Sequence, residues 1–202
     1  MKVFENSQVS KNSMFGERAF AMALVVDTSE GMRGEPINKL NHTLKEFGEF
    51  LQQEGKNLGV MVDITIISFN STVQIEMPFK PASECQAPEL VAGGGCVLNE
   101  ALNTALNVLE DRKRLYRENC VKYFRPYLLV LTGGKDTDKE KAASTKARLR
   151  DYIERRKVGF MPMGMGKNVD IANLEEYYPE RARYKVVPDA NARNLKECFS
   201  WC

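Results

Sequence analysis

The stretch AFAMALVVDTSEGMRGEPINKL, which runs from Ala19 to Leu40, decides the fold of this chain. Its first eight residues, Ala19–Val26, form an almost continuous apolar run, which is typical of a strand buried on both faces of a sheet. A polar loop that contains two glycines follows from Asp27 to Gly34. From Glu35 onward the apolar residues recur with a helical period, and Pro36 suits the first turn of a helix. The stretch therefore predicts a strand, a loop and a helix.

The same alternation of strands and helices continues along the chain. Thr72–Phe79 alternates apolar and polar residues after a tight connection, which predicts a hairpin to an antiparallel edge strand. Together the elements predict a doubly wound α/β fold, with a mainly parallel central sheet, one antiparallel edge strand and helices on both faces. Residues 1–17 are expected to be a lead-in, and residues 18–202 a single domain. The other expected strands are Val62–Phe69, Tyr127–Leu131, Val158–Met163 and Tyr184–Val187, and the helices are Glu35–Glu54, Leu98–Glu118, Asp138–Lys157, Ile171–Tyr178 and Asn191–Trp201.

Composition excludes several classes of protein. The 202 residues carry 29 basic and 27 acidic side chains, a net charge of +2, so no nucleic-acid partner is expected. Met1–Phe15 lacks the apolar core of a signal peptide, and no apolar run reaches the ~18 residues that span a bilayer. The five cysteines are odd in number and include no C-x-x-C pair, which favours reduced thiols. We therefore expect a cytoplasmic protein without a membrane partner; the sequence does not indicate its oligomeric state.

A ligand site is expected where three polar loops converge. In open α/β sheets, ligands bind beyond the carboxyl ends of the strands, where the strand order reverses. The first loop, Asp27–Met32, leaves the first strand. The second, Gly93–Cys96, precedes the Leu98 helix. The third, Leu131–Asp138, leaves the Tyr127 strand.

Three motifs on these loops resemble one known family. They read VVDTSEGMRGEPINKLN, GGGCVLNEALNTALNVLEDRK and YFRPYLLVLTGGKDTD. In this order and spacing they are similar to the von Willebrand factor A domain, and in particular to its stand-alone bacterial branch associated with tellurite-resistance-type operons. The resemblance extends from about Ala19 to Trp201. It implies a metal-ion-dependent adhesion site, in which D-x-S-x-S, a threonine and an aspartate hold Mg²⁺ or Mn²⁺ and a carboxylate of the partner completes the coordination.

This sequence departs from that pattern at three positions. Asp27 and Ser29 match, but Gly31 replaces the second serine, Cys96 the threonine and Gly133 the aspartate. We therefore expect no metal cofactor; if an ion were bound, Asp27 and Ser29 would hold it, with Mg²⁺ or Mn²⁺ as the ion of a functional adhesion site. A partner-binding face is expected instead at the same loops, made of Asp27, Ser29, Glu30, Gly31, Met32, Gly95, Cys96, Gly133 and Asp136.

Several of these residues also have a structural interpretation. A carboxylate at Asp27 can accept backbone N–H bonds and hold the first loop. Asp136 and Asp138 can cap the helix that begins near Lys139. Met32, Val97 and Leu98 could anchor a partner or pack in the core.

The pattern supports three hypotheses about function. The first is a non-catalytic protein-interaction module that needs no metal and acts with a bacterial kinase and phosphatase signalling or stress-resistance system. The second is metal-dependent binding through altered ligands, where a thiolate at Cys96 would favour zinc. The third is a cysteine enzyme, because a helix N-terminus can lower the pKa of a thiol such as Cys96. Against this third hypothesis, no arginine follows Cys96 at phosphatase spacing, and His42 is expected to face solvent on the far side of its helix.

Overall fold

A five-stranded mixed sheet forms the centre of the protein. The computed structural model describes residues 18–54, 60–166, 169–180 and 186–200, so the predicted lead-in, residues 1–17, lies outside the described residues. The strand order is β3-β2-β1-β4-β5. The pairs β1–β2, β1–β4 and β4–β5 are parallel, and β2–β3 at one edge is antiparallel, which confirms the predicted fold class. The strands are β1 (Ala19–Asp27), β2 (Met61–Phe69), β3 (Val73–Pro81), β4 (Tyr127–Thr132) and β5 (Gly159–Gly164).

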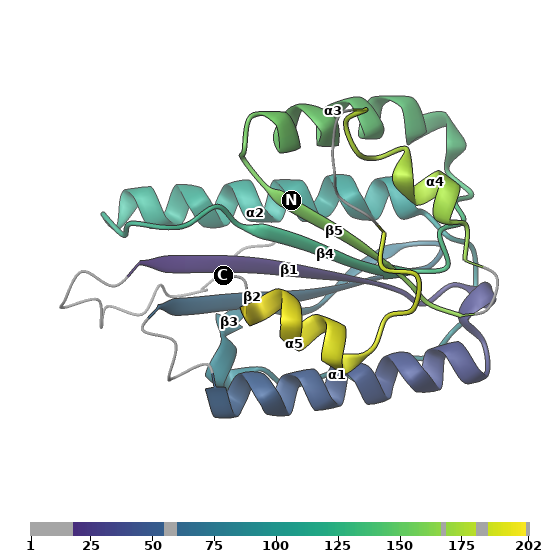
Figure 1. The fold of residues 1–202 in the computed structure, drawn as a ribbon, viewed down its shortest axis with the longest axis horizontal. Helices are drawn as coiled ribbons and strands as arrows, with labels where there is room; N and C mark the ends of the chain where they lie inside the picture. Colours follow the sequence, from purple (N-terminus) through teal and green to yellow (C-terminus); the bar gives the residue numbers. More distant parts are fainter. Residues whose placement is uncertain (1–17, 55–59, 167–168, 181–185, 201–202) are drawn as a thin grey trace.

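Helices cover both faces of this sheet (Figure 1). The long helices α1 and α2 have the bounds that the sequence predicted. Helix α1 lies on one face with α5, whereas α2 lies on the other with α3 (Figure 1). The helices are α1 (Glu35–Glu54), α2 (Leu98–Glu118), α3 (Ala142–Glu154), α4 (Ile171–Glu175) and α5 (Ala192–Ser200), with 3₁₀ turns η1 (Glu30–Met32), η2 (Ala82–Glu84) and η3 (Lys139–Lys141).

Strand β1 is buried along its whole length because its alternate side chains enter two different cores. Successive side chains of a strand point to opposite faces of the sheet. Phe20, Met22, Leu24 and Val26 therefore pack in the core beneath α1, and the alanines between them pack in the core beneath α2. The expected apolar stripe of α1 is buried in the first of these cores: Ile37, Leu40, Leu44, Phe47 and Leu51. Each such side chain contributes about 1.5–3 kcal/mol on burial.

Several predicted elements differ from the structure. The short helix expected over Ile171–Tyr178 ends as α4 at Glu175. The helix expected over Asp138–Lys157 begins with the 3₁₀ turn η3 and ends as α3 at Glu154. The strand expected over Tyr184–Val187 is reduced, in its described part, to a single parallel bridge between Val187 and Met163. Residues 184 and 185 lie outside the described part of the chain.

Strand order fixes the place of a site. The chain leaves β1 toward β2 on one side, whereas β4 lies on the other side of β1. The order therefore reverses between β1 and β4, and the loops beyond their carboxyl ends face a natural crevice. These are the first loop (residues 27–34) and the third loop (residues 132–138), with the second loop (residues 93–97) beside them.

Candidate functional site

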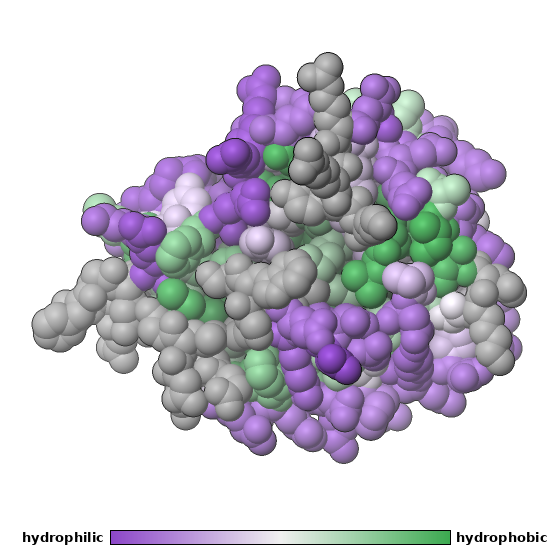
Figure 2. All heavy atoms as spheres, viewed as in Figure 1, coloured by the Kyte–Doolittle hydropathy of each residue, from purple (hydrophilic) through white to green (hydrophobic). Residues whose placement is uncertain are grey.

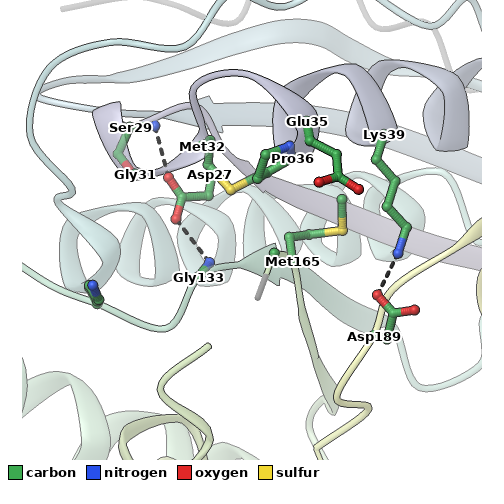
Figure 3. Close-up of a pocket in the computed structure, with 12 residues that line it drawn as sticks. Asp27, Ser29, Gly31, Met32, Glu35, Pro36, Lys39, Gly133, Met165 and Asp189 are labelled. Atoms are coloured by element: carbon green, nitrogen blue, oxygen red, sulfur yellow. Dashed lines mark hydrogen bonds and ion pairs between the residues drawn. The ribbon is translucent and has the colours of Figure 1, made fainter. Parts of the chain in front are cut away.

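Asp27, the last residue of β1, bridges the point where the strand order reverses. Its side chain is buried, with 1% exposure. Oδ1 accepts a hydrogen bond from the Ser29 amide at 2.8 Å, and Oδ2 accepts one from the Thr132 hydroxyl at 2.7 Å. The Gly133 amide donates to Oδ2 at 3.2 Å (Figure 3). The structural role expected for Asp27 is therefore confirmed, and this role reaches the third loop as well as the first.

Cys96 lies beside Asp27 and carries a protonated thiol. Its Sγ donates to the Lys135 carbonyl at 2.7 Å and lies 3.8 Å from Asp27 Oδ2. Burial raises the pKa of the Cys96 thiol well above its ordinary value, and the Asp27 carboxylate raises it further, while a hydrogen bond with Ser29 opposes the shift. The expectation that the helix N-terminus would lower this pKa is wrong, because desolvation and nearby carboxylates outweigh the helix dipole.

Hydrogen bonds join every pair of the three loops. The first and second are joined by Glu30 N to Gly94 O and Gly93 N to Thr28 O, both 2.9 Å. The second and third are joined at Cys96, whose carbonyl accepts from the Thr137 amide at 2.8 Å and whose amide donates to Thr137 Oγ1 at 3.1 Å. Asp27 joins the first and third, so the protein's own groups hold the loops together.

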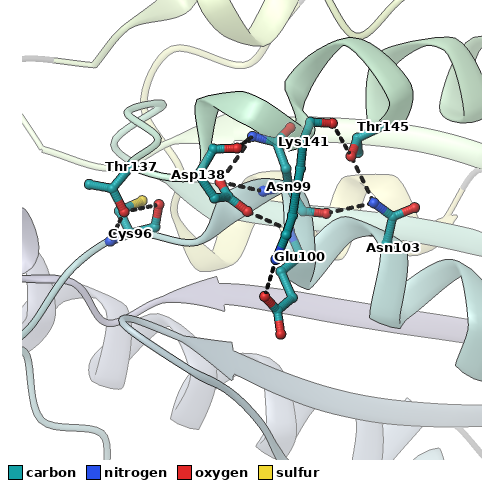
Figure 4. A network of polar contacts seen from close by, with 8 residues as sticks. All are labelled: Cys96, Asn99, Glu100, Asn103, Thr137, Asp138, Lys141 and Thr145. Atoms are coloured by element: carbon teal, nitrogen blue, oxygen red, sulfur yellow. Dashed lines mark hydrogen bonds and ion pairs between the residues drawn. The ribbon is translucent and has the colours of Figure 1, made fainter.

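Asp138 caps α2, not the helix that follows it in sequence. Its carboxylate accepts from the backbone amides of Asn99 at 3.2 Å and Glu100 at 2.8 Å (Figure 4). It makes no side-chain cap bond to its own 3₁₀ turn, so the predicted cap of the Lys139 helix is wrong. Asp136 does not fill that role either, since its Oδ2 accepts from Asn99 Nδ2 at 3.0 Å. Asp138 binds α2 because the first backbone amides of a helix lack intrahelical partners, whereas Asp136 contacts only the Asn99 side chain there.

Three residues of this polar cluster were not singled out in the sequence. Asn99 is fully buried, and its Oδ1 accepts from the Tyr177 hydroxyl at 2.7 Å. Thr132 and Thr137 supply the hydroxyls that contact Asp27 and Cys96. The position of Thr132 at the end of a buried strand, next to Gly133, was the signal that could have found it.

The other predicted face residues separate into exposed and buried sets. Glu30 and Gly31 are exposed, and Glu30 forms an ion pair with Arg33 at 2.8 Å. Gly95 is half-buried, and its amide donates to Ser71 Oγ at 2.7 Å. Met32 is 1% exposed and Leu98 is buried, so core packing, one of the two interpretations offered for them, is confirmed, although Met32 also lines the cavity described below. Both pack in the core because η1 and α2 turn these side chains toward the sheet.

A cavity of about 590 Å³ opens beside Asp27. Its lining comes from the first loop, the start of α1, the third loop and the segments after β5 (Figure 3). The volume lies within the range of small-molecule and side-chain pockets. Ser29, Gly31 and Gly133 line it together with Asp27, so the structure brings these predicted residues to one site.

A sequence profile of the von Willebrand factor type A domain matches residues 22–200. The chain belongs to the von Willebrand factor type A domain family. Proteins of this family generally act as interaction modules. Among curated proteins, none matches the chain.

Solved structures share this von Willebrand factor A fold at low sequence identity. A von Willebrand factor type A protein from Catenulispora acidiphila has a TM-score of 0.64 at 12% identity, over 90% of this chain and 42% of that chain. The manganese-loaded TRAP protein of Plasmodium vivax has a TM-score of 0.59 at 16% identity, over 89% of this chain and 71% of that chain. An aerotolerance-related membrane protein from Bacteroides fragilis has a TM-score of 0.57 at 12% identity, over 90% of this chain and 97% of that chain. At these identities the likeness concerns the fold alone.

The oxygen ligands at this von Willebrand factor A site are few. Of the five positions in the adhesion-site pattern, only Asp27 and Ser29 offer an oxygen side chain, and Asp27 already accepts three hydrogen bonds. A protonated thiol is a poor ligand for a hard cation. Within the described residues, no group of three or more His, Cys, Asp or Glu could hold a metal ion. The residues present therefore do not fit a hexacoordinate magnesium or manganese ion.

None of the described helices is long and apolar enough to cross a bilayer.

Proposed function

We propose that this protein is a non-catalytic interaction module that binds a protein partner with the three loops at the carboxyl ends of β1 and β4, without a metal bridge. The observation that carries the proposal is the set of hydrogen bonds that joins all three loops. In an adhesion site of this family, a metal ion draws ligands from the same three loops. Here Asp27, Cys96 and Thr137 perform that linking, so the face is pre-formed without an ion.

The chemistry of Cys96 also supports binding over catalysis. Its raised pKa keeps the thiol protonated at neutral pH, and a thiol is a far weaker nucleophile than a thiolate. Its hydrogen goes to the Lys135 carbonyl, not to a base. His42, the one histidine, is exposed on α1 and pairs with Glu46 at 3.7 Å, outside the cavity.

The surface near these loops suits a protein partner. Figure 2 shows an apolar area at the end of the molecule where the strands finish, beside α4, on a face that is otherwise mostly hydrophilic. Apolar areas rimmed by polar groups are common at protein interfaces. The motif resemblance to the tellurite-resistance-type branch suggests a cytoplasmic partner from a bacterial kinase and phosphatase system.

Melting temperatures test the proposal directly. The wild-type chain and Asp27→Ala are compared in EDTA and in millimolar Mg²⁺, Mn²⁺ and Zn²⁺, with Asp151→Ala on α3 as the charge-matched control. An ion present at about 100 times its Kd adds about 2.7 kcal/mol, a shift of several degrees in a domain of this size. We expect no shift in any variant. A wild-type shift that disappears only in Asp27→Ala would establish a metal site with altered ligands and overturn the proposal.

Partner capture tests the interaction face. The wild-type chain is used as bait in EDTA, beside Gly31→Arg on the first loop and Asp151→Arg on α3. We expect a partner that is retained in EDTA and by Asp151→Arg but lost with Gly31→Arg. A partner that is released by EDTA and returns with Mg²⁺ would contradict a metal-free interface.

A further inference from the structure

The cavity beside Asp27 has a buried carboxylate at its inner end, with no cation opposite it among the described residues. The Ser29 amide, the Thr132 hydroxyl and the Gly133 amide donate to Asp27, the Cys96 thiol lies 3.8 Å from Oδ2, and all four groups are neutral. Each carboxylate oxygen offers about two acceptor sites, and among the described residues only the Ser29 amide donates to Oδ1, so one site on Oδ1 remains open. A buried charge without a counter-ion is costly, and a bound cation would relieve that cost.

Apolar side chains separate this carboxylate from the outer end of the cavity. Met32, Pro36 and Met165, together with the Glu35 carboxylate, lie between Asp27 and the ion pair of Lys39 with Asp189 (Figure 3). Met32 and Met165 are buried, whereas the Lys39 and Asp189 side chains are 34% and 69% exposed. The cavity thus combines an apolar wall with a negative inner end.

The charged side chains around the cavity differ in whether they are paired. The lining carries the carboxylates of Asp27, Glu35 and Asp189 and the ammonium groups of Lys39 and Lys135, and Glu35 makes a further interaction of its own. Lys39 is paired with Asp189, and no ion pair of Lys135 is found within the described residues. The carboxylates of Asp27, Asp136 and Asp138 all raise the pKa of the neighbouring Cys96 thiol, which agrees with a negative potential at this point.

We propose that the cavity receives a lysine or arginine side chain of the protein partner, with its cation over the Asp27 carboxylate and its methylene stem along Met32, Pro36 and Met165. Basic side chains have this division into an apolar stem and a charged head. The partner's cation then occupies the place where the family's adhesion site holds a metal. The face would therefore bind a basic side chain of the partner, where a metal-loaded adhesion site binds an acidic one. This inference rests on the proposed metal-free interaction function.

Amide NMR spectra of the full chain test the inference with small probes. The blocked amino acids N-acetyl-arginine N-methylamide and its lysine and glutamate equivalents are titrated while the Ser29 and Gly133 amide signals are followed. We expect saturable millimolar binding of a basic probe. Asp27→Asn should weaken it at least tenfold, because a hydrogen bond to a charged group is lost. The matched variant Asp151→Asn, outside the cavity, should leave it unchanged.

Lys135→Gln provides a second readout that does not touch the loop hydrogen bonds of Asp27. Removing this exposed ammonium should tighten basic-probe binding roughly two- to five-fold, the usual effect of one exposed charge. If Asp27→Asn does not fold, the Lys135→Gln titration tests the proposed binding of a basic side chain by itself. Absence of saturable binding by both basic probes, unchanged binding in a folded Asp27→Asn, or tighter binding of the glutamate probe would overturn the inference.

A parallel titration with Mg²⁺ separates the two proposals. Shifts of the same amides by millimolar Mg²⁺, reversed by EDTA, would overturn the metal-free function itself. Failure of the basic probes without any Mg²⁺ effect would overturn only the basic-side-chain inference.

Discussion

Restoring the three missing ligands should create a metal site in this protein. The variant combines Gly31→Ser, Cys96→Thr and Gly133→Asp. A Cβ at Gly31 would lie 3.8 Å from Ser29 Oγ, and one at Gly133 would lie 3.9 Å from the Met165 carbonyl oxygen, which are ordinary van der Waals contacts. Neither glycine has a positive φ, so both backbones accept a side chain. The local structure therefore permits the substitutions at the two glycines.

The expected stability change follows from the distance between the two carboxylates. The Gly133 amide is 3.2 Å from Asp27 Oδ2, so a carboxylate on residue 133 would lie within about 5 Å of it. In EDTA the repulsion between the two carboxylates should lower the free energy of unfolding by up to about 3 kcal/mol, at an effective dielectric constant of about 20. Mg²⁺ at about 100 times its Kd should return about 2.7 kcal/mol, which raises Tm by about 5–11 °C.

Calorimetry or thermal fluorescence in EDTA and in 10 mM Mg²⁺, about a hundredfold above a Kd of ~0.1 mM, measures both effects. The matched control carries Gly133→Ala with the same two other substitutions, so it changes the backbone equally but adds no carboxylate. We expect a Mg²⁺-dependent rise in the variant and none in this control or in the wild type. A Mg²⁺-dependent rise in Tm that is as large in the wild-type chain as in the variant would refute the reasoning, because the substituted positions would then not limit metal binding.

Three further perturbations probe what holds the site and the core. Asp138→Ala should lower the free energy of unfolding in urea by about 2–4 kcal/mol, because α2 loses its cap and buried Asn99 loses an acceptor; a loss below about 0.5 kcal/mol would contradict the cap. Arg112→Leu should lower the free energy of unfolding by about 3–5 kcal/mol, because it leaves the buried Asp63 carboxylate without its cation. Adding Asp63→Leu should recover part of that loss, and a double variant whose loss equals the sum of the two single losses would argue against the pair. Burial raises the pKa of the Cys85 thiol from 9.0 to about 11, so the folded state holds this proton more tightly than the unfolded state; its contribution to stability is complete below pH 9 and is lost as pH rises to about 11. Cys85→Ser should therefore flatten the alkaline decline in urea-unfolding experiments, and an unchanged slope would count against this assignment.

Local sequence pattern determined most of the secondary structure. The apolar run of β1 and the helical stripes of α1 and α2 predicted elements whose bounds agree with the structure to within a residue. These patterns succeed because a strand buried on both faces and a helix buried on one face each impose a repeat that is visible within a single segment. The antiparallel edge strand β3 was predicted for the same reason, from its alternation and its short connection to β2.

The sequence also indicated which loops would converge and which ligand positions lack oxygen. Gly31 and Gly133 have no side chain to offer in any conformation, so their chemistry can be read without a structure. The order of three motifs along the chain was enough to place Asp27, Cys96 and Gly133 at one end of a parallel sheet.

Only the tertiary structure decided how the polar groups of those loops are used. Asp138 precedes one helix but caps another, because folding brings the first turn of α2 within reach of its carboxylate. The Cys96 thiol lies at a helix N-terminus but has a raised pKa, since burial and Asp27 outweigh the helix dipole. The cavity beside Asp27 likewise depends on segments up to 162 residues apart in sequence, from Asp27 to Asp189. Desolvation, capping and cavity shape each depend on residues that are distant in sequence, and these residues come together only when the sheet forms.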